Sequence, residues 1–155
     1  MNYWLIKSEG DCYSIDDLKK DGRTAWEGIR NYQARNYMRD MKVGDLLLFY
    51  HSMSDPTGVY GIAKVVSEAH IDESALNPKD EHYDPKAAKY VAEGKEPLWS
   101  CVDVAFVQKF SKPVSLEEIK KNKELGHMLV AKPGQRLSVM PVSKEHFDKV
   151  VEMRK

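Results

Sequence analysis

Hydrophobic and polar positions along the chain predict several short strands. Tyr3–Lys7 is apolar on both faces, which favours a central position in a sheet. Leu46–Ser52 is continuously apolar until it becomes polar at its end, so we expect that end at a functional edge. Val59–Ala69 is predicted to pair antiparallel with it, and Gly61 to mark a bulge or a close approach. The remaining predicted strands are Trp99–Phe110 and Arg136–Val142.

Helices are predicted where a capping residue precedes an amphipathic run. Ser14 and Ser115 each begin a capping box, with an acid three residues later. Asn31 is a preferred N-cap residue and precedes a run with one apolar face, made of Ala34, Tyr37, Met38 and Met41. Ser143 is expected to cap a terminal helix whose inner face carries Phe147, Val150 and Val151.

The mixture of strands and short helices predicts an α+β fold, a mixed sheet or small barrel with helices packed outside. At 155 residues the chain fits one domain, which buries about two-thirds of its unfolded surface. The stretch Asp72–Pro97 contains three prolines and several acids, and we expect it to be the least structured part. A loop of this length is more often functional or ordered by packing than idle.

Charge and cysteine content bear on the binding partners and the cellular compartment of the protein. Lys plus Arg equals Asp plus Glu at 24 each, but Arg23–Lys42 carries five cations against two anions, and Glu68–Lys86 six anions against two cations. If these segments lie apart, one side of the molecule favours phosphate. Two cysteines without a CxxC pair fit a reducing cytosol. With no secretory signal and no long apolar run, we expect a soluble cytoplasmic protein without a membrane partner.

No catalytic or metal-binding motif occurs in the sequence. The GxSxG, P-loop, GxGxxG and HExxH patterns are missing, and the five histidines lack ligand spacing, so we expect no metal and no cofactor. Cys12 and Cys101 fit structural thiols better than nucleophiles. A binding module with aromatic, amide and guanidinium groups remains, and these groups suit an extrahelical base with its flanking phosphates.

The stretch Arg23–Lys42 is the main candidate for such a site. It contains Trp26, and a polar stripe formed by Asn31, Arg35 and Arg39 lies beside the apolar face of its helix. This arrangement suits a wall of a binding site, but it also fits an ordinary surface helix with solvated arginines. Capping competes with ligand binding for the role of Asn31. A single histidine at a strand end is commonly a surface residue, so His51 is a secondary candidate.

Several motifs, in order along the chain, resemble the EVE domain family. They are YWLIKSEG from Tyr3, WEGIRNYQARN from Trp26, MKVGDL from Met41, FYHS from Phe49, YDP from Tyr83 and RLSVMPV from Arg136. The resemblance covers nearly the whole chain, and the motif from Trp26 is highly specific. It implies a single domain, residues 1–155, with a PUA-like β-barrel and peripheral helices, related to the YTH and ASCH domains.

The resemblance also implies a non-catalytic reader that captures one modified base, a modified cytosine in DNA or a modified base in RNA. Trp26 would then stack on the base, Ser8 would contact it, and Asn31 would read its polar edge. Lys7 and Arg35 would lie near phosphate, and Tyr50 or His51 would close the pocket. The other candidate site residues are Glu9, Arg30, Tyr32 and Ser52.

Two departures from the family pattern affect the pocket. Gly10 stands where the family usually has proline, which predicts a more mobile loop, and Ala131–Gln135 replaces an arginine-bearing stretch. Other functions stay open at this level. They are an enzyme or a small-molecule or nucleoside binder that uses the same pocket, and a protein-interaction adaptor. If the protein is a reader, a separate effector protein is a further possible partner.

Overall fold

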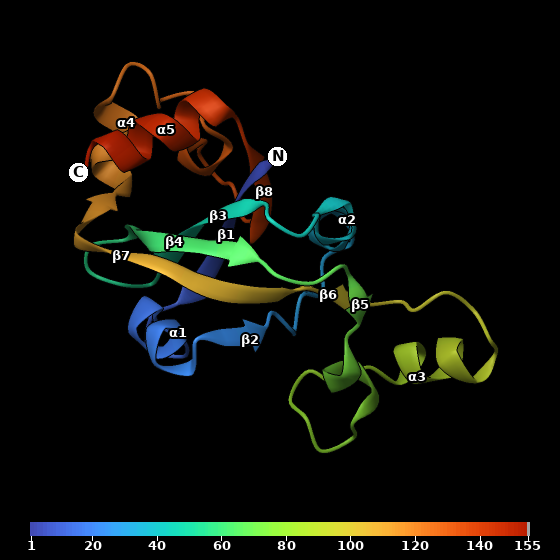
Figure 1. Ribbon diagram of the computed structural model, residues 1–155. Coiled ribbons are helices and arrows are strands. Elements are labelled where there is room, and N and C mark those ends of the chain that lie inside the picture. The colour runs from blue at the N-terminus through green and yellow to red at the C-terminus, as the bar shows by residue number, and fades with distance from the viewer. Residues whose placement is uncertain (155) are drawn as a thin grey trace.

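The structure, a computed structural model, describes residues 1–154 (Figure 1). Six strands form one curled mixed sheet in the order β2-β7-β4-β3-β1-β8. Their bounds are β1 (Tyr3–Glu9), β2 (Arg23–Ala25), β3 (Leu46–Ser52), β4 (Gly58–Val65), β7 (Asp103–Ser115) and β8 (Val139–Val142). The predicted α+β class, with a PUA-like curled sheet and peripheral helices, is confirmed. Lys155, the end of the expected domain, lies outside the described residues.

The centre of the sheet brings two polar strand ends together. β1 runs parallel to β3 and antiparallel to β8, so it is a central strand as predicted. In the parallel register Ser8 pairs with His51, and Glu9 with Ser52. Because parallel strands end at the same edge of a sheet, the polar ends of β1 and β3 lie side by side.

Four α-helices surround the sheet and follow the predicted caps. They are α1 (Ile15–Asp21), α2 (Tyr32–Asp40), α4 (Leu116–Lys121) and α5 (Lys144–Glu152). The capping boxes of Ser14 and Ser115 are both formed, and Asn31 and Ser143 cap α2 and α5. Figure 1 shows α4 and α5 on one side of the sheet and α1 on the other. A short 3-10 helix, η2 (Leu129–Ala131), precedes β8.

Gly61 has both of the features expected of it. The pairing of β4 shifts register at Gly61 against its neighbouring strands, which is a β-bulge. A Cβ atom at Gly61 would collide with the backbone oxygen of Gln108 and touch Ile15. Several predicted strands have other bounds, however. The first extends to Glu9, β4 ends at Val65 instead of Ala69, and the last begins at Val139 instead of Arg136. The expected strand Trp99–Phe110 is divided after Cys101.

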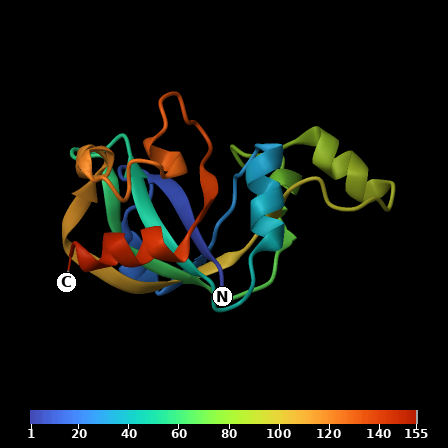
Figure 2. The ribbon, with the colours of Figure 1, turned by 90° about the horizontal axis from the view of Figure 1, so that it is seen from above.

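Residues 72–99 form a side lobe with its own small core, which corrects the expected irregular loop. The lobe contains η1 (Glu73–Leu76) and α3 (Pro85–Ala92). Its core consists of Ala75, Ala87, Leu98 and Trp99. Two short antiparallel strands, β5 (His70–Ile71) and β6 (Ser100–Cys101), pair directly before and after the lobe. Figure 2 shows α2 between the sheet and α3.

No helix within residues 1–154 combines the length and the apolar character needed to cross a membrane.

Candidate functional site

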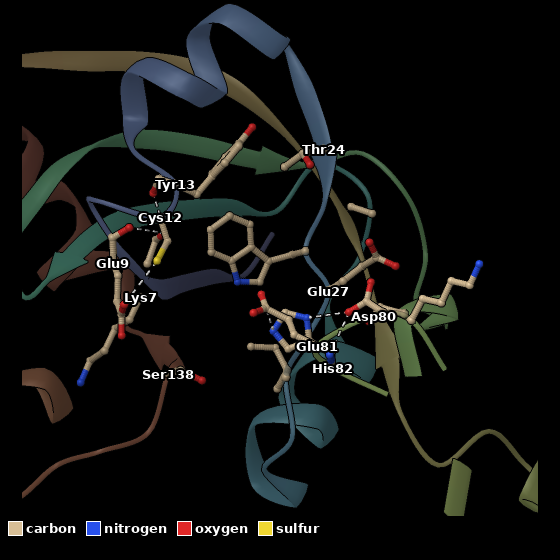
Figure 3. A pocket seen from close by; sticks show the side chains of 17 residues that line it. Lys7, Glu9, Cys12, Tyr13, Thr24, Glu27, Asp80, Glu81, His82 and Ser138 are labelled. Carbon is tan, nitrogen blue, oxygen red and sulfur yellow. Dashed lines mark hydrogen bonds and ion pairs between the residues drawn. The ribbon is translucent and has the colours of Figure 1, made fainter. Parts of the chain in front are cut away.

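An open pocket of about 1090 Å³ lies where the end of β1 and the segment after β2 face the side lobe (Figure 3). Four of the predicted site residues line it: Lys7, Ser8, Glu9 and Trp26. The other lining residues are Cys12, Tyr13, Thr24, Ala25, Glu27, Gly28, Ile29, Ser74, Lys79, Asp80, Glu81, His82 and Ser138.

The indole of Trp26 is held firmly at the back of this pocket. Its backbone N–H donates to the carbonyl oxygen of Val102 at 2.8 Å, and only 8% of the residue is exposed. The rings of Tyr13 and Phe49 meet the indole at 73° and 78°, with centroids 6.1 and 5.5 Å away. Trp26 is therefore part of the core as well as of the pocket wall.

The end of β1 forms a second wall. The Ser8 hydroxyl donates to the carbonyl oxygen of Tyr13 at 2.6 Å, which ties β1 to the loop before α1. Glu9 accepts a hydrogen bond from the Cys12 thiol at 3.4 Å, and this contact raises the pKa of Cys12. Lys7 is half-buried, which lowers its pKa, and its Nζ lies 3.5 Å from the carbonyl oxygen of Gln135.

A buried carboxylate joins the segment after Trp26 to the side lobe. Asp72 is fully buried, and its Oδ2 accepts from the Gly28 N–H and from Arg30 Nη1, both at 2.9 Å. Its Oδ1 accepts from the N–H and the hydroxyl of Ser74. Burial alone would raise the pKa of Asp72, but these hydrogen bonds outweigh it and hold that pKa below its ordinary value of 3.8. Arg30 also donates to the carbonyl oxygen of His82 at 2.8 Å.

The lobe residues 79–82 form the wall opposite the end of β1. The backbone N–H of His82 donates to Asp80 Oδ1 at 2.8 Å, and the His82 ring pairs with the same oxygen at 3.3 Å. Gly28 has a φ of 86°, and a Cβ atom there would collide with the His82 ring. Glycine is thus required at position 28 both by conformation and by space.

The pocket is richer in acids than in cations. Its lining contains four carboxylates, those of Glu9, Glu27, Asp80 and Glu81, but only two lysines, Lys7 and Lys79. Partial burial, followed by repulsion from Asp72, raises the pKa of Glu27. The two oppositely charged sequence segments meet here through Arg30 and Asp72, so the condition for one phosphate-favouring side, that the segments lie apart, is not met.

Seven predicted site residues lie outside the pocket lining. Arg30 acts behind it, through Asp72 and His82. Asn31 is the N-cap of α2 and accepts from the Ala34 N–H at 2.9 Å. Tyr32 stacks on Trp99 on the outer surface, and Arg35 lies over the Tyr32 ring.

Tyr50, His51 and Ser52 complete these seven and lie behind the end of β1. Tyr50 is buried, which raises its pKa to about 12. His51 is buried, accepts from the Ile15 N–H through Nε2 at 3.1 Å and stacks on Tyr60. The Ser52 hydroxyl donates to the Ser8 carbonyl oxygen at 3.4 Å. These residues support the pocket wall without facing the pocket.

The arginines of α2 form hydrogen bonds to other parts of the protein. Arg35 Nη1 donates to the carbonyl oxygen of Leu98 at 3.0 Å, and Arg39 Nε to the hydroxyl of Ser100 at 3.1 Å. The two arginines of the stripe that suited a binding-site wall thus fasten α2 to the end of the side lobe and to β6.

The two departures from the family pattern lie next to the pocket. A Cβ atom at Gly10 would meet Ser54 Oγ and His51 Nδ1, so this backbone packs closely where greater mobility was expected. Gln135, in the altered stretch, meets Lys7 at the pocket rim.

Sequence reasoning missed Tyr13, Glu27, Gly28 and the lobe residues 79–82 as parts of the pocket. Glu27 and Gly28 directly follow Trp26 in the most specific motif, and that position was the available signal. Residues 79–82 carry no comparable signal, because only the folded lobe brings them to Trp26. Within residues 1–154 no group of three or more His, Cys, Asp or Glu side chains is arranged to hold a metal ion.

Comparison with known proteins places this geometry in a family. Residues 2–153 match the EVE domain. Thymocyte nuclear protein 1 of chicken is 39% identical over 97% of this chain and 68% of its own length. A crystal structure of a Pseudomonas syringae protein is 40% identical and superimposes with a TM-score of 0.91, over 99% of each chain.

A third similar structure has a bound nucleic acid. It is human THYN1 protein in complex with 5-methylcytosine-containing DNA, 36% identical, with a TM-score of 0.89 over 100% of this chain and 98% of that one. The name thymocyte nuclear protein 1, shared by several relatives, describes a nuclear protein and contradicts the cytoplasmic location expected from the sequence. Because the family match extends over nearly the whole chain, this protein belongs to the EVE domain family.

Proposed function

We propose that this protein, acting as a single domain, is a non-catalytic reader that captures one modified base of DNA, a modified cytosine, in the pocket beside Trp26. The observation that carries the proposal is this open pocket, built around the most specific motif of the chain. A similar fold, human THYN1, is in complex with DNA that contains 5-methylcytosine.

The pocket has the properties that an extrahelical base requires. An aromatic side chain forms its back, and carboxylates, backbone groups and hydroxyls surround the space in front. A flipped base needs a close-fitting space and hydrogen bonds to its polar edge. Flipping also takes the base out of the duplex, so the acidic lining meets the base and not the phosphates.

Cations for the phosphates lie at the rim. Lys7 and Lys79 line the pocket, and Lys132 and Arg136 are exposed in the loop that reaches Lys7 through Gln135. We infer that these side chains contact the phosphates of the nucleotides on either side of the flipped base. A modified base in RNA is the second ligand to test, and a reader without chemistry of its own would act through a separate effector protein.

Binding to short labelled oligonucleotides tests the proposal. Fluorescence anisotropy would compare 5-methylcytosine with cytosine in DNA and in RNA, at two salt concentrations. We expect tighter binding to modified DNA and a lower affinity at higher salt. Equal affinity for the modified and unmodified strands would defeat the proposal.

A pocket-filling variant locates the binding. Ser138→Phe places a ring in the pocket, and Ser111→Phe makes the same change on the exposed surface of β7. We expect the first to abolish the preference for 5-methylcytosine and the second to keep it. Binding that survives Ser138→Phe in a folded protein would assign it to another surface.

A further inference from the structure

The three tryptophans differ in how their indole N–H groups are paired. Trp4 Nε1 donates to Asp45 Oδ2 at 3.0 Å, and Trp99 Nε1 donates to Asp84 Oδ2 at 2.7 Å. Trp26 Nε1 has no acceptor within residues 1–154, although 92% of this residue is buried, since only 8% is exposed. Among the three tryptophans in the described residues, only Trp26 thus has an indole N–H without a protein partner.

The unpaired N–H faces the pocket. No buried side-chain nitrogen or oxygen atom in the described part of the chain lacks a partner, so Nε1 of Trp26 belongs to the exposed part of its side chain. That exposed part lines the pocket. The donor is thus available to a bound molecule.

The same burial leaves little of the ring for stacking. Tyr13 and Phe49 pack against the indole almost at right angles, and the exposed fraction is too small for a free ring face. A base that stacks needs such a face. In this conformation Trp26 offers the pocket its polar edge instead.

Glu27 supplies the complementary group. It follows Trp26 directly, lines the pocket and forms no ion pair within residues 1–154. Each of the neighbouring acids Asp72 and Asp80, by contrast, has a cationic or histidine partner. An ionised carboxylate only accepts hydrogen bonds, so Glu27 suits a ligand group that donates them.

A donor and an acceptor in one pocket match some bases and not others. Cytosine presents an acceptor at its O2 carbonyl and a donor at its N4 amino group. Thymine presents carbonyl oxygens at both of these positions, so its O4 would face a carboxylate with no proton between them. Polar groups that a wrong base would leave unpaired in the pocket give strong discrimination against that base.

We propose that Trp26 and Glu27 together read the hydrogen-bonding edge of the captured base, the indole N–H donating to the ring carbonyl and Glu27 accepting from the exocyclic amino group. The pocket then selects cytosine bases and rejects thymine, independently of any methyl group on the ring. This inference rests on the proposed function, and it changes the expected role of Trp26 from stacking to hydrogen bonding.

Exchanging the carboxylate for an amide tests the acceptor. Glu27→Gln can donate to a carbonyl as well as accept, so it should bind thymine better and 5-methylcytosine less well. We expect the affinity ratio of 5-methylcytosine to thymine to fall by about tenfold, the effect of one hydrogen bond to a charged group. Glu68→Gln, the same change on the exposed surface outside the pocket, should leave the ratio unchanged. An unchanged ratio in Glu27→Gln overturns the assignment of Glu27.

The indole N–H is tested in the wild-type protein by NMR. Of the three indole signals, that of Trp26, assigned by its loss in Trp26→Phe, should move downfield when an oligonucleotide with 5-methylcytosine binds. The signals of Trp4 and Trp99 should stay in place. A Trp26 signal that does not move while binding occurs overturns the role of its N–H.

The two proposals fail in different ways. If the wild-type protein binds 5-methylcytosine no better than cytosine, the proposed function fails. If it binds 5-methylcytosine selectively, but neither the Glu27→Gln ratio nor the Trp26 signal changes, only the reading of the base edge fails. If the Trp26→Phe variant folds, its affinity for 5-methylcytosine gives a further test of the indole N–H. It keeps the ring and loses the donor, so we expect an affinity about tenfold lower.

Discussion

The replacement Asp72→Asn tests the connection between the pocket and the side lobe. Each carboxylate oxygen of Asp72 has a fixed role: Oδ1 accepts from Ser74, and Oδ2 accepts from Gly28 and Arg30. Asparagine keeps one acceptor oxygen and turns the other into an amide that donates. The two N–H or O–H groups that donated to the replaced oxygen then lose their acceptor and face the donating amide group of the asparagine.

The expected change in the free energy of unfolding follows from these contacts. A hydrogen bond to a charged group contributes about 1.5–3 kcal/mol, and two such bonds are lost. Arg30 keeps its bond to the carbonyl oxygen of His82 and is partly exposed, which offsets part of the loss. We therefore expect Asp72→Asn to lower the free energy of unfolding by about 3 kcal/mol.

Urea denaturation at neutral pH measures this change. The matched control is Asp148→Asn, which removes an exposed ion pair with Lys144 on α5 and should change the free energy of unfolding by about 0.5 kcal/mol or less. Because the pKa of Asp72 is lower in the folded protein, its contribution is complete above pH 3.8 and is lost as the pH falls through the lower folded value. A loss below about 1 kcal/mol for Asp72→Asn would refute the reasoning.

Three further predictions concern the sheet, the wall behind the pocket and its rim. Gly61→Ala should lower the free energy of unfolding by about 1–3 kcal/mol, because its Cβ collides with the backbone oxygen of Gln108; a change near zero in urea denaturation would contradict the close approach. Burial lowers the pKa of His51, so the unfolded chain binds the proton more strongly. The free energy of unfolding should therefore decline as the pH falls from 6.5, the pKa of His51 in the unfolded chain, toward its lower pKa in the folded protein. His51→Gln, which can still accept from the Ile15 N–H, should flatten this decline. Equal slopes of the free energy of unfolding against pH in both proteins would exclude His51 as the source. Lys7→Gln should reduce the slope of log affinity against log salt for DNA by about 0.9 if Lys7 contacts one phosphate, whereas an unchanged slope would place the phosphate contacts elsewhere.

Local patterns in the sequence predicted the elements that depend on neighbouring residues. The caps at Ser14, Ser115 and Asn31 depend on residues three positions away, and all three are formed. α3 was missed because the three prolines of Asp72–Pro97 suggested a loop. Pro85 is in fact at the first position of the helix after the N-cap Asp84, where proline is well tolerated.

The candidate site was predicted in part, for a similar reason. Trp26 and the end of β1 belong to sequence motifs, and the structure brings them to one pocket. The hydrogen-bond partner of an arginine, by contrast, can lie far away in the sequence, so the residues around the arginine do not predict it. Arg35 donates to the carbonyl oxygen of Leu98, 63 positions away, and no local pattern in the sequence predicts this contact.

The side lobe has a consequence for how the pocket can be altered. The chain enters and leaves this lobe at one paired neck, β5 and β6, and the lobe supplies Ser74 and residues 79–82 to the pocket. Residues 79–82 can therefore be replaced while the pocket wall from β1 and the segment after β2 stays unchanged. Exchange of this lobe between relatives would then transfer ligand preference as a module.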